Sequence, residues 1–149
     1  IGAGTGSVAI EMALLARRGR VFAREQDEEA CNLIRKNKEK FGVYNLSITQ
    51  GMAPDALQSL PVPQAAFIGG SKGNIQAILD RLMEKNASMR LVVSAVTLET
   101  LEKSLAAMEA LAVKNVEICQ IAITHAVKTG ASHMLRAQNP IFLISGGGV

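Results

Sequence analysis

Three closely spaced glycines, Gly2, Gly4 and Gly6, form the pattern Gly-x-Gly-x-Gly directly before an apolar helical stretch. Such a turn between a strand and a helix lets a ligand approach the bare main chain, because no Cβ atom blocks it. Glu25 lies 19 positions after Gly6 and closely follows the hydrophobic run at residues 20–23. A carboxylate about 20 residues after a glycine turn, at the end of the next strand, can bind both hydroxyls of a ribose.

The spacing of the glycines bears on the kind of cofactor. One residue separates the second and third glycines, whereas the dinucleotide fingerprint Gly-x-Gly-x-x-Gly has two. This favours a nucleoside without a pyrophosphate, of which S-adenosylmethionine (SAM) is the commonest. We expect Gly2 and Gly4 to face its aminocarboxypropyl arm, and the amides near Gly6 and Ser7 to favour its carboxylate. The alternatives are a ligand-free turn and a surface position for Glu25.

Length and composition are those of a single domain. Of the 149 residues, 48% are hydrophobic, which is enough for a sizeable core. No apolar run approaches the roughly 20 residues of a membrane span, and no signal peptide is visible, so we expect no membrane partner. Because the chain starts at Ile1 inside an expected strand, we interpret residues 1–149 as one methyltransferase domain truncated at its N-terminus. Cys31 and Cys119 lie in periodic segments, which favours buried reduced thiols and a cytoplasmic location.

Charge and aromatic content argue against a nucleic acid partner. The formal net charge of +3 suits an anionic partner but does not require one. Four Phe, one Tyr and no Trp are too few for a platform that stacks single-stranded bases.

His125 alternates with Ile121 and Ile123, which predicts a structural histidine on a strand with one buried face. No Cys/His spacing supports a metal site, and the Gly-x-Ser-x-Gly nucleophile motif is absent.

Short β-branched runs alternate with longer helical stretches, which is typical of a parallel sheet with crossover helices. The expected strands are residues 20–25, 46–49, 64–68 and 90–96, and the expected helices are residues 7–18, a helix capped by Asp27, 55–57, 74–85 and 98–112. The tail, residues 116–126 and 133–145, lacks a helical stretch between its strands, which predicts an antiparallel pair. The expected fold is therefore α/β: a Rossmann-like class I SAM-dependent methyltransferase with a mostly parallel sheet and an antiparallel C-terminal β-hairpin.

Two loops that follow expected strands carry candidate site residues. Residues 51–54 follow the strand after which many methyltransferases place adenine, and Met52 can only pack against such a ring. Gly69 and Gly70 end the next strand, and their small size leaves room for a bulky acceptor beside a transferable methyl group. Lys72 either meets a substrate carboxylate or is solvated. Both loops can equally be simple turns.

Five segments together resemble one family: residues 1–8 (IGAGTGSV), 51–54 (GMAP), 67–71 (FIGGS), 93–100 (VSAVTLET) and 139–146 (NPIFLISG). That family is the decarboxylating precorrin methyltransferase of cobalamin synthesis, CbiT or the C-terminal half of CobL, also called the precorrin-6Y methyltransferase family. The resemblance covers essentially the whole chain, and its third and fourth segments are much more specific than the glycine turn.

The resemblance implies methyl transfer from SAM to a meso carbon of a precorrin, coupled to decarboxylation of an acetate side chain, in a homotetramer. It implies that Gly2, Gly4, Thr5 and Gly6 hold the methionine part, Glu25 the ribose, and Met52 and Ala53 the adenine, while Gly69 and Gly70 flank the reacting centre. The candidates to anchor the several tetrapyrrole carboxylates are Lys72, Thr97, His133 and Arg136. No catalytic side chain is assigned, because such a transfer mainly needs alignment and exclusion of water.

Some positions depart from the pattern of the family. Arg24 stands at a normally apolar strand position, and Met52 replaces an Asp or Asn that in many relatives accepts from the adenine amino group. The rival functions are a SAM-dependent methyltransferase acting on RNA or protein, a non-catalytic SAM-binding subunit, and an NAD-dependent oxidoreductase. Gly69 and Gly70 argue against the first, which favours an Asn-Pro-Pro-Tyr-like segment at that point.

Overall fold

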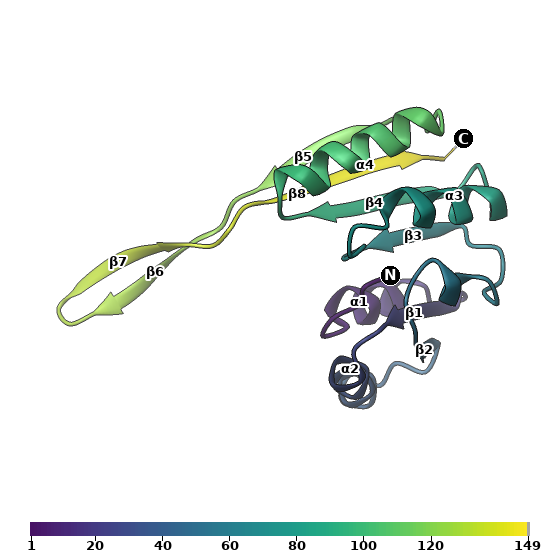
Figure 1. Ribbon diagram of the computed structural model, residues 1–149. Helices are drawn as coiled ribbons and strands as arrows, with labels where there is room; N and C mark the ends of the chain where they lie inside the picture. Colours follow the sequence, from purple (N-terminus) through teal and green to yellow (C-terminus); the bar gives the residue numbers. More distant parts are fainter. Residues whose placement is uncertain (149) are drawn as a thin grey trace.

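The computed structural model describes residues 1–148, which form an α/β body with a long arm at one side (Figure 1). The helices are α1 (Ser7–Leu15), α2 (Glu28–Lys40), the 3₁₀ helix η1 (Asp55–Leu57), α3 (Ile75–Lys85) and α4 (Leu98–Ala110). The strands are β1 (Val21–Glu25), β2 (Leu46–Gln50), β3 (Ala65–Ile68), β4 (Arg90–Ala95), β5 (Glu117–Ile121), β6 (Thr124–Thr129), β7 (Ser132–Ala137) and β8 (Ile141–Gly147).

Side-chain caps mark the starts of α2 and α4. Asp27 precedes α2, and its Oδ1 accepts a 2.7 Å hydrogen bond from the Ala30 amide. Thr97 precedes α4, and its Oγ1 accepts a 3.2 Å hydrogen bond from the Thr100 amide. Each cap satisfies one amide that the first helical turn leaves without a partner. The local sequence therefore places these helices directly after β1 and β4, at the strand ends where the site lies.

The strands form a sheet in two parts, joined by the first residues of the chain. β1 pairs with β2, and β3 pairs with β4, in both cases parallel. β8 lies antiparallel between β4 and β5. Between the two parts, the Ala3 amide donates to the Arg24 carbonyl at 3.2 Å, and the Gly69 amide donates to the Ile1 carbonyl at 2.8 Å. The glycine turn is thus tied to β1 on one side and to the end of β3 on the other.

The core also has two parts, one for each part of the sheet. The larger cluster joins α3 and α4 to β3, β4 and β8, and its fully buried side chains include Leu79, Leu91, Met108 and Ile144. The smaller cluster joins α1 and α2 to β1 and β2 around Ile10, Ile34 and Leu46. Burial of each large aliphatic side chain contributes roughly 1.5–3 kcal/mol. The glycine turn before α1 therefore lies next to a well-packed core.

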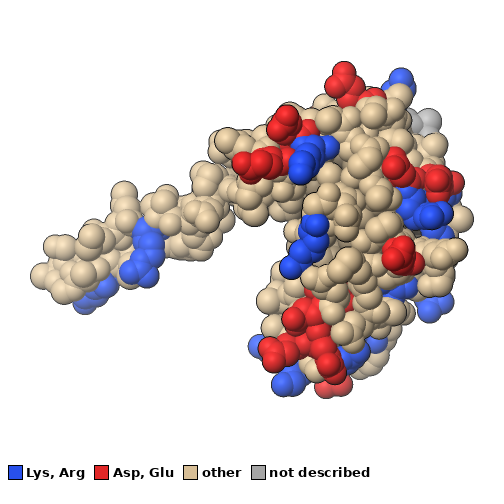
Figure 2. Space-filling view, in the orientation of Figure 1, with Lys and Arg blue, Asp and Glu red and all other residues tan. Residues whose placement is uncertain are grey.

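β6 and β7 form a two-stranded arm that projects away from the body (Figure 1). Of the residues in these two strands only Val127 is partly buried, while Met134 and Leu135 are 60% and 77% exposed. Residues 123–138 contain Lys128 and Arg136 but no acidic residue. Figure 2 shows the arm as a largely uncharged surface with a few basic side chains. In this single chain, none of residues 1–148 covers the exposed apolar side chains of the arm.

The alternation of strands and helices and the antiparallel ending agree with the sequence prediction, but the tail differs in detail. Each of its two expected strands is divided, so that β5 and β8 join the sheet while β6 and β7 form the arm. The prediction of a buried thiol is confirmed for Cys31 and wrong for Cys119, which is exposed because β5 is an edge strand. The prediction of a half-buried strand around His125 is also wrong, because the arm has no covering layer. None of the helices within residues 1–148 is both long and apolar enough to cross a membrane.

Candidate functional site

The glycine turn combines left-handed backbone with a close approach of two loops. Gly2 and Gly4 have φ angles of +63° and +53°, which residues other than glycine rarely adopt. A Cβ atom on Gly2 would stand 2.6 Å from the main-chain nitrogen and oxygen of Gly70. A Cβ atom on Gly4 would meet no atom within 4 Å, so the space beside Gly4 is open. The turn therefore packs tightly against the end of β3 and leaves bare main chain facing a cavity.

Glu25 is held by the main chain around it and is only 9% exposed. Its Oε2 accepts a hydrogen bond from the Gly4 amide at 2.8 Å, and its Oε1 accepts from the amides of Gln26 and Asp27 at 2.8 and 3.1 Å. Burial by itself would raise the pKa of Glu25, but the three amides outweigh it and lower the pKa below the ordinary value. Each carboxylate oxygen can accept two hydrogen bonds, so Oε2 keeps an acceptor position for a ligand hydroxyl.

One cavity brings together the residues from four loops. Its lining includes Gly2, Gly4, Glu25, Gln26, Met52, Ala53, Gly70, Ser71 and Lys72. Along its wall lie main chain of the glycine turn without side chains, an ionised carboxylate and the exposed thioether of Met52. This donor set fits SAM, whose amino-acid tail, ribose diol and adenine need main-chain contacts, an acceptor and an apolar surface respectively. Gln26 and Ile78 also line it but were not singled out from the sequence, because neither residue type signals a ligand by itself.

Arg24 also lines this cavity, on the strand position before Glu25. It is 5% exposed, and its Nε donates to the carbonyl of Ala56 in η1 at 2.9 Å. Its Nη1 is fully buried and has no hydrogen-bond partner among the residues that the structure describes. The sequence marked Arg24 only as unusual for a strand; its place at the cavity depends on the tertiary fold.

A second hollow continues from the first across the end of β3. It shares Gly70, Ser71 and Lys72 with the first cavity and extends past Gly69 to Val96 and Thr100. Lys72 has a φ angle of +50°, a left-handed conformation that costs a non-glycine residue of order 1 kcal/mol or more. The Gly70–Lys72 loop therefore lines both hollows.

The other predicted residues lie outside the first cavity. Thr5 and Gly6 directly precede α1, and the Thr5 carbonyl accepts from Asn37 Nδ2 at 2.9 Å. Thr97 is occupied as the cap of α4. His133 and Arg136 belong to β7 in the arm, away from both hollows of this chain (Figure 1). Within residues 1–148 no three His, Cys, Asp or Glu side chains gather in a way that could hold a metal ion.

Known proteins of one family match this chain over nearly its whole length. The model of the family described as "Precorrin methyltransferase domain" matches residues 1–146. A probable cobalt-precorrin-6B C(15)-methyltransferase (decarboxylating) from Saccharolobus solfataricus is 40% identical over 150 residues, which are 98% of this chain and 75% of that protein. A protein of the same name from Pyrobaculum calidifontis is 35% identical over 147 residues, which are 97% of this chain and 75% of that protein.

Solved structures give the same result in three dimensions. The precorrin-6y C5,15-methyltransferase from Geobacter metallireducens has a TM-score of 0.91 and 33% identity, covering 100% of this chain and 77% of its own. The precorrin 8W decarboxylase from Methanobacterium thermoautotrophicum has a TM-score of 0.90 and 32% identity, covering 99% and 78%. A SAM-dependent O-methyltransferase from Thermotoga maritima, at 17% identity and a TM-score of 0.77, shares the fold alone. The fold is that of the class I SAM-dependent methyltransferases, as the sequence predicted, and the chain belongs to the precorrin methyltransferase family.

Proposed function

We propose that this protein transfers a methyl group from SAM to a meso carbon of a precorrin and couples the transfer to decarboxylation of an acetate side chain in cobalamin synthesis. The observation that carries the proposal is the first cavity, which is lined by the glycine turn, by Glu25 and by the Gly70–Lys72 loop. Membership of the precorrin methyltransferase family supports the choice of substrate class, because several relatives are named as decarboxylating cobalt-precorrin-6B C(15)-methyltransferases.

The cofactor roles follow from the contacts around the first cavity. Main chain without side chains at Gly2 and Gly4 suits the amino-acid tail, with Thr5 and Gly6 between it and the start of α1. The free acceptor position on Glu25 suits one hydroxyl of the ribose diol. Met52 and Ala53 present an apolar surface for the purine. In this assignment only main chain, one carboxylate and one thioether hold the cofactor in place.

Bound SAM supplies an electrophilic methyl group on a sulfonium. The chain has to hold the substrate carbon in line with that group and exclude water, since an enamine-like carbon of a reduced tetrapyrrole needs no strong base. Gly69 and Gly70, which line the second hollow, leave room there for a flat, bulky substrate. Decarboxylation is favoured when the acetate group leaves water and the conjugated ring accepts its electrons. No single side chain is then expected to carry most of the rate.

Substrate carboxylates need cationic or hydroxyl partners. Of the four candidate residues, Lys72 is the one that lines both hollows. Thr97, at the start of α4, lies beside Val96, which lines the second hollow. His133 and Arg136 can act on the substrate only if the arm lies against the site of another copy. We therefore assign Lys72 as the first candidate to bind a substrate carboxylate. A role of His133 and Arg136 depends on assembly of several copies.

We also propose that the protein assembles as a homotetramer through its arm. The exposed apolar side chains of β6 and β7 and the lack of acidic residues there support an interface, because single chains rarely expose such surfaces without a partner. A soluble cytoplasmic setting accords with this proposal. Fractionation of cells that express the full-length protein tests the location.

The function is tested by incubating the full-length protein with SAM and a cobalt-precorrin-6B-type substrate and weighing the product by mass spectrometry. The expected product has gained a methyl group and lost carbon dioxide. Binding of S-adenosylhomocysteine (SAH) without turnover would instead support a non-catalytic SAM-binding subunit. Methylation of RNA or protein in the same assay would support another SAM-dependent methyltransferase, and thermal stabilisation by NAD but not by SAH would indicate an oxidoreductase.

A further inference from the structure

Asn37 in α2 holds the glycine turn by a side-chain hydrogen bond. Its Nδ2 donates to the Thr5 carbonyl at 2.9 Å, across 32 residues of sequence. Ile34 lies three positions earlier in α2, so the two side chains are neighbours on the helix surface. A Cβ atom on Gly6 would stand 2.9 Å from both γ carbons of Ile34, so this face of α2 packs directly against the turn. α2 therefore supports the turn by an apolar contact at Gly6 and a polar contact at Thr5.

The turn is held from another side by β1. The Gly4 amide donates to Glu25 Oε2 at 2.8 Å. The peptide group that joins Gly4 to Thr5 therefore lies between two fixed points, one on β1 and one on α2. Gly4 lines the first cavity, whereas Asn37 lies outside the lining of that cavity. The main chain proposed to meet the amino-acid tail of SAM is thus held in part by a side chain that does not reach the ligand.

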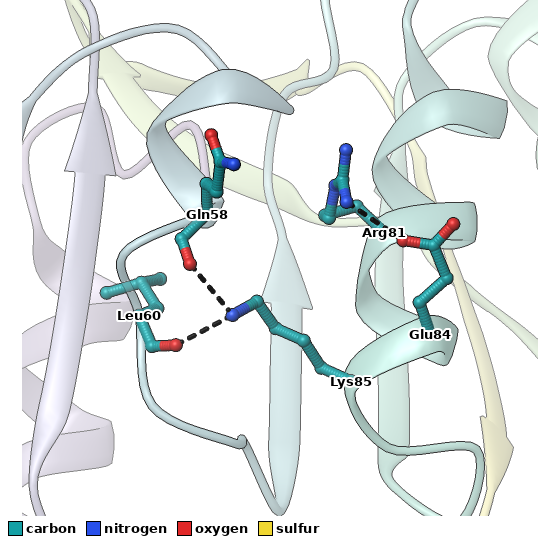
Figure 3. Close-up of polar contacts among 5 residues, drawn as sticks. All are labelled: Gln58, Leu60, Arg81, Glu84 and Lys85. Carbon is teal, nitrogen blue, oxygen red and sulfur yellow. Dashed lines mark hydrogen bonds and ion pairs between the residues drawn. The ribbon is translucent and has the colours of Figure 1, made fainter.

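The loop on the purine side of the cavity has a support of its own. Lys85, at the end of α3, donates from Nζ to the carbonyls of Gln58 and Leu60 at 3.1 and 2.7 Å, as Figure 3 shows. These two carbonyls belong to the segment that continues from η1, which follows residues 51–54. Lys85 and Asn37 therefore support different loops, one proposed for the purine and one proposed for the amino-acid tail.

We propose that Asn37 is a positioning residue for the amino-acid tail of SAM, because its hydrogen bond holds the glycine turn in shape before the cofactor binds. The proposal rests on the proposed use of SAM. A loop that is already ordered binds more tightly, since ordering it at the moment of binding costs free energy. Without this bond the turn gains freedom next to Gly4. Glu25 keeps its partners at the amides of Gln26 and Asp27, so the ribose contact is spared.

The test compares two ligands by isothermal titration calorimetry with the full-length protein. SAH carries the amino-acid tail, whereas 5′-methylthioadenosine has the same purine and ribose but a methyl group in place of the tail. Asn37→Leu keeps the size and branching of the side chain and removes its donor without adding a charge. We expect this variant to bind SAH roughly fivefold more weakly than wild type, and to bind 5′-methylthioadenosine within about twofold of wild type.

Two control variants separate a local effect from a general one. Asn32→Leu is the same substitution on an exposed position of the same helix, where the Asn32 Oδ1 accepts from Arg35 Nη1 at 2.6 Å. It should bind both ligands as wild type does. Lys85→Met removes a support of the purine side and should leave the ratio of the two dissociation constants unchanged. Melting temperatures without ligand are measured for all variants, so that lost stability is recognised as such.

A ratio of dissociation constants that changes in Asn37→Leu, and in neither control, supports the positioning role. If Asn37→Leu weakens both ligands by the same factor, Asn37 supports only the fold and the proposal is wrong. Unchanged binding of SAH in Asn37→Leu also overturns it. If wild type binds neither ligand, the proposed use of SAM fails as well, and that result is distinct because it appears without any variant.

Discussion

The Gly4 amide donates a 2.8 Å hydrogen bond to the Glu25 carboxylate across a separation of 21 residues. The glycine turn and the acidic residue of β1 are thus one unit, and not two independent ligand contacts. Ionisation of Glu25 stabilises the turn before any cofactor arrives, and Glu25 also lines the cavity. A change at Glu25 should therefore alter both the shape of the turn and the binding of a ribose.

Glu25→Gln tests this double role. The amide of Gln replaces one acceptor oxygen by a donor that faces main-chain N–H groups. We expect SAH affinity to fall at least tenfold and the free energy of unfolding to fall by about 1–3 kcal/mol. Calorimetry and urea denaturation measure the two effects. Glu29→Gln, on the exposed first turn of α2, is the control. Unchanged SAH affinity in Glu25→Gln would exclude the ribose role.

The lowered pKa of Glu25 predicts a specific dependence of stability on pH. A depressed folded-state pKa contributes stability that is fully present above the unfolded pKa, about 4.3 for Glu, and that is lost as pH falls through the folded pKa. The difference in unfolding free energy between wild type and Glu25→Gln should be constant from about pH 8 to pH 5 and should shrink below about pH 4. Urea denaturation over this range measures it, and a difference that grows towards acid pH would contradict the assigned sign.

Gly2→Ala and Gly42→Ala separate backbone strain from close contact. Both glycines have a φ angle of +63°, but a Cβ on Gly2 meets Gly70 at 2.6 Å, whereas a Cβ on Gly42 meets nothing within 4 Å. We expect Gly42→Ala to cost about 1 kcal/mol of stability and to leave SAH binding intact. Gly2→Ala should cost more and should abolish SAH binding, because the end of β3 has to move. Equal effects of the two substitutions in thermal denaturation and calorimetry would argue against this contact.

Lys85 and Arg81, both on α3, provide a second pair with different expected effects. Lys85→Met removes two hydrogen bonds that hold the segment after η1, and we expect a loss of about 1–2 kcal/mol in unfolding free energy. Arg81→Met removes only an exposed ion pair with Glu84 and should cost less than about 0.5 kcal/mol. The prediction fails if chemical denaturation gives the two variants the same stability.

The arm predicts how the protein assembles. Leu135→Glu places a charge on the most exposed apolar side chain of β7, and we expect the tetramer to dissociate while the body stays folded. Light scattering after size-exclusion chromatography measures the mass, and calorimetry with SAH checks the body. Leu15→Glu, an equally exposed site at the end of α1, should leave the mass unchanged. A monomeric wild type, or a tetrameric Leu135→Glu, would remove the arm as the interface.

Local sequence determined much of the fold and of the loops that line the cavity. The glycine pattern, the capping residues Asp27 and Thr97 and the alternation of strands with helices all act over a few residues, so they can be interpreted without a structure. The spacing from Gly6 to Glu25 predicted the carboxylate at the end of β1 as a cofactor partner. What the spacing did not show is that the Gly4 amide already binds that carboxylate.

Tertiary structure decided what depends on partners distant in sequence. The alternation of Ile121, Ile123 and His125 predicted a strand with a buried face, but burial needs a covering layer, and the arm has none. The same holds for Cys119 on the edge strand β5. Arg24 looked merely out of place in a strand; its hydrogen bond to Ala56 in η1 and its place beside the cavity exist only in the assembled fold. Periodicity records which side chains share a face, whereas only the assembled fold determines what that face meets.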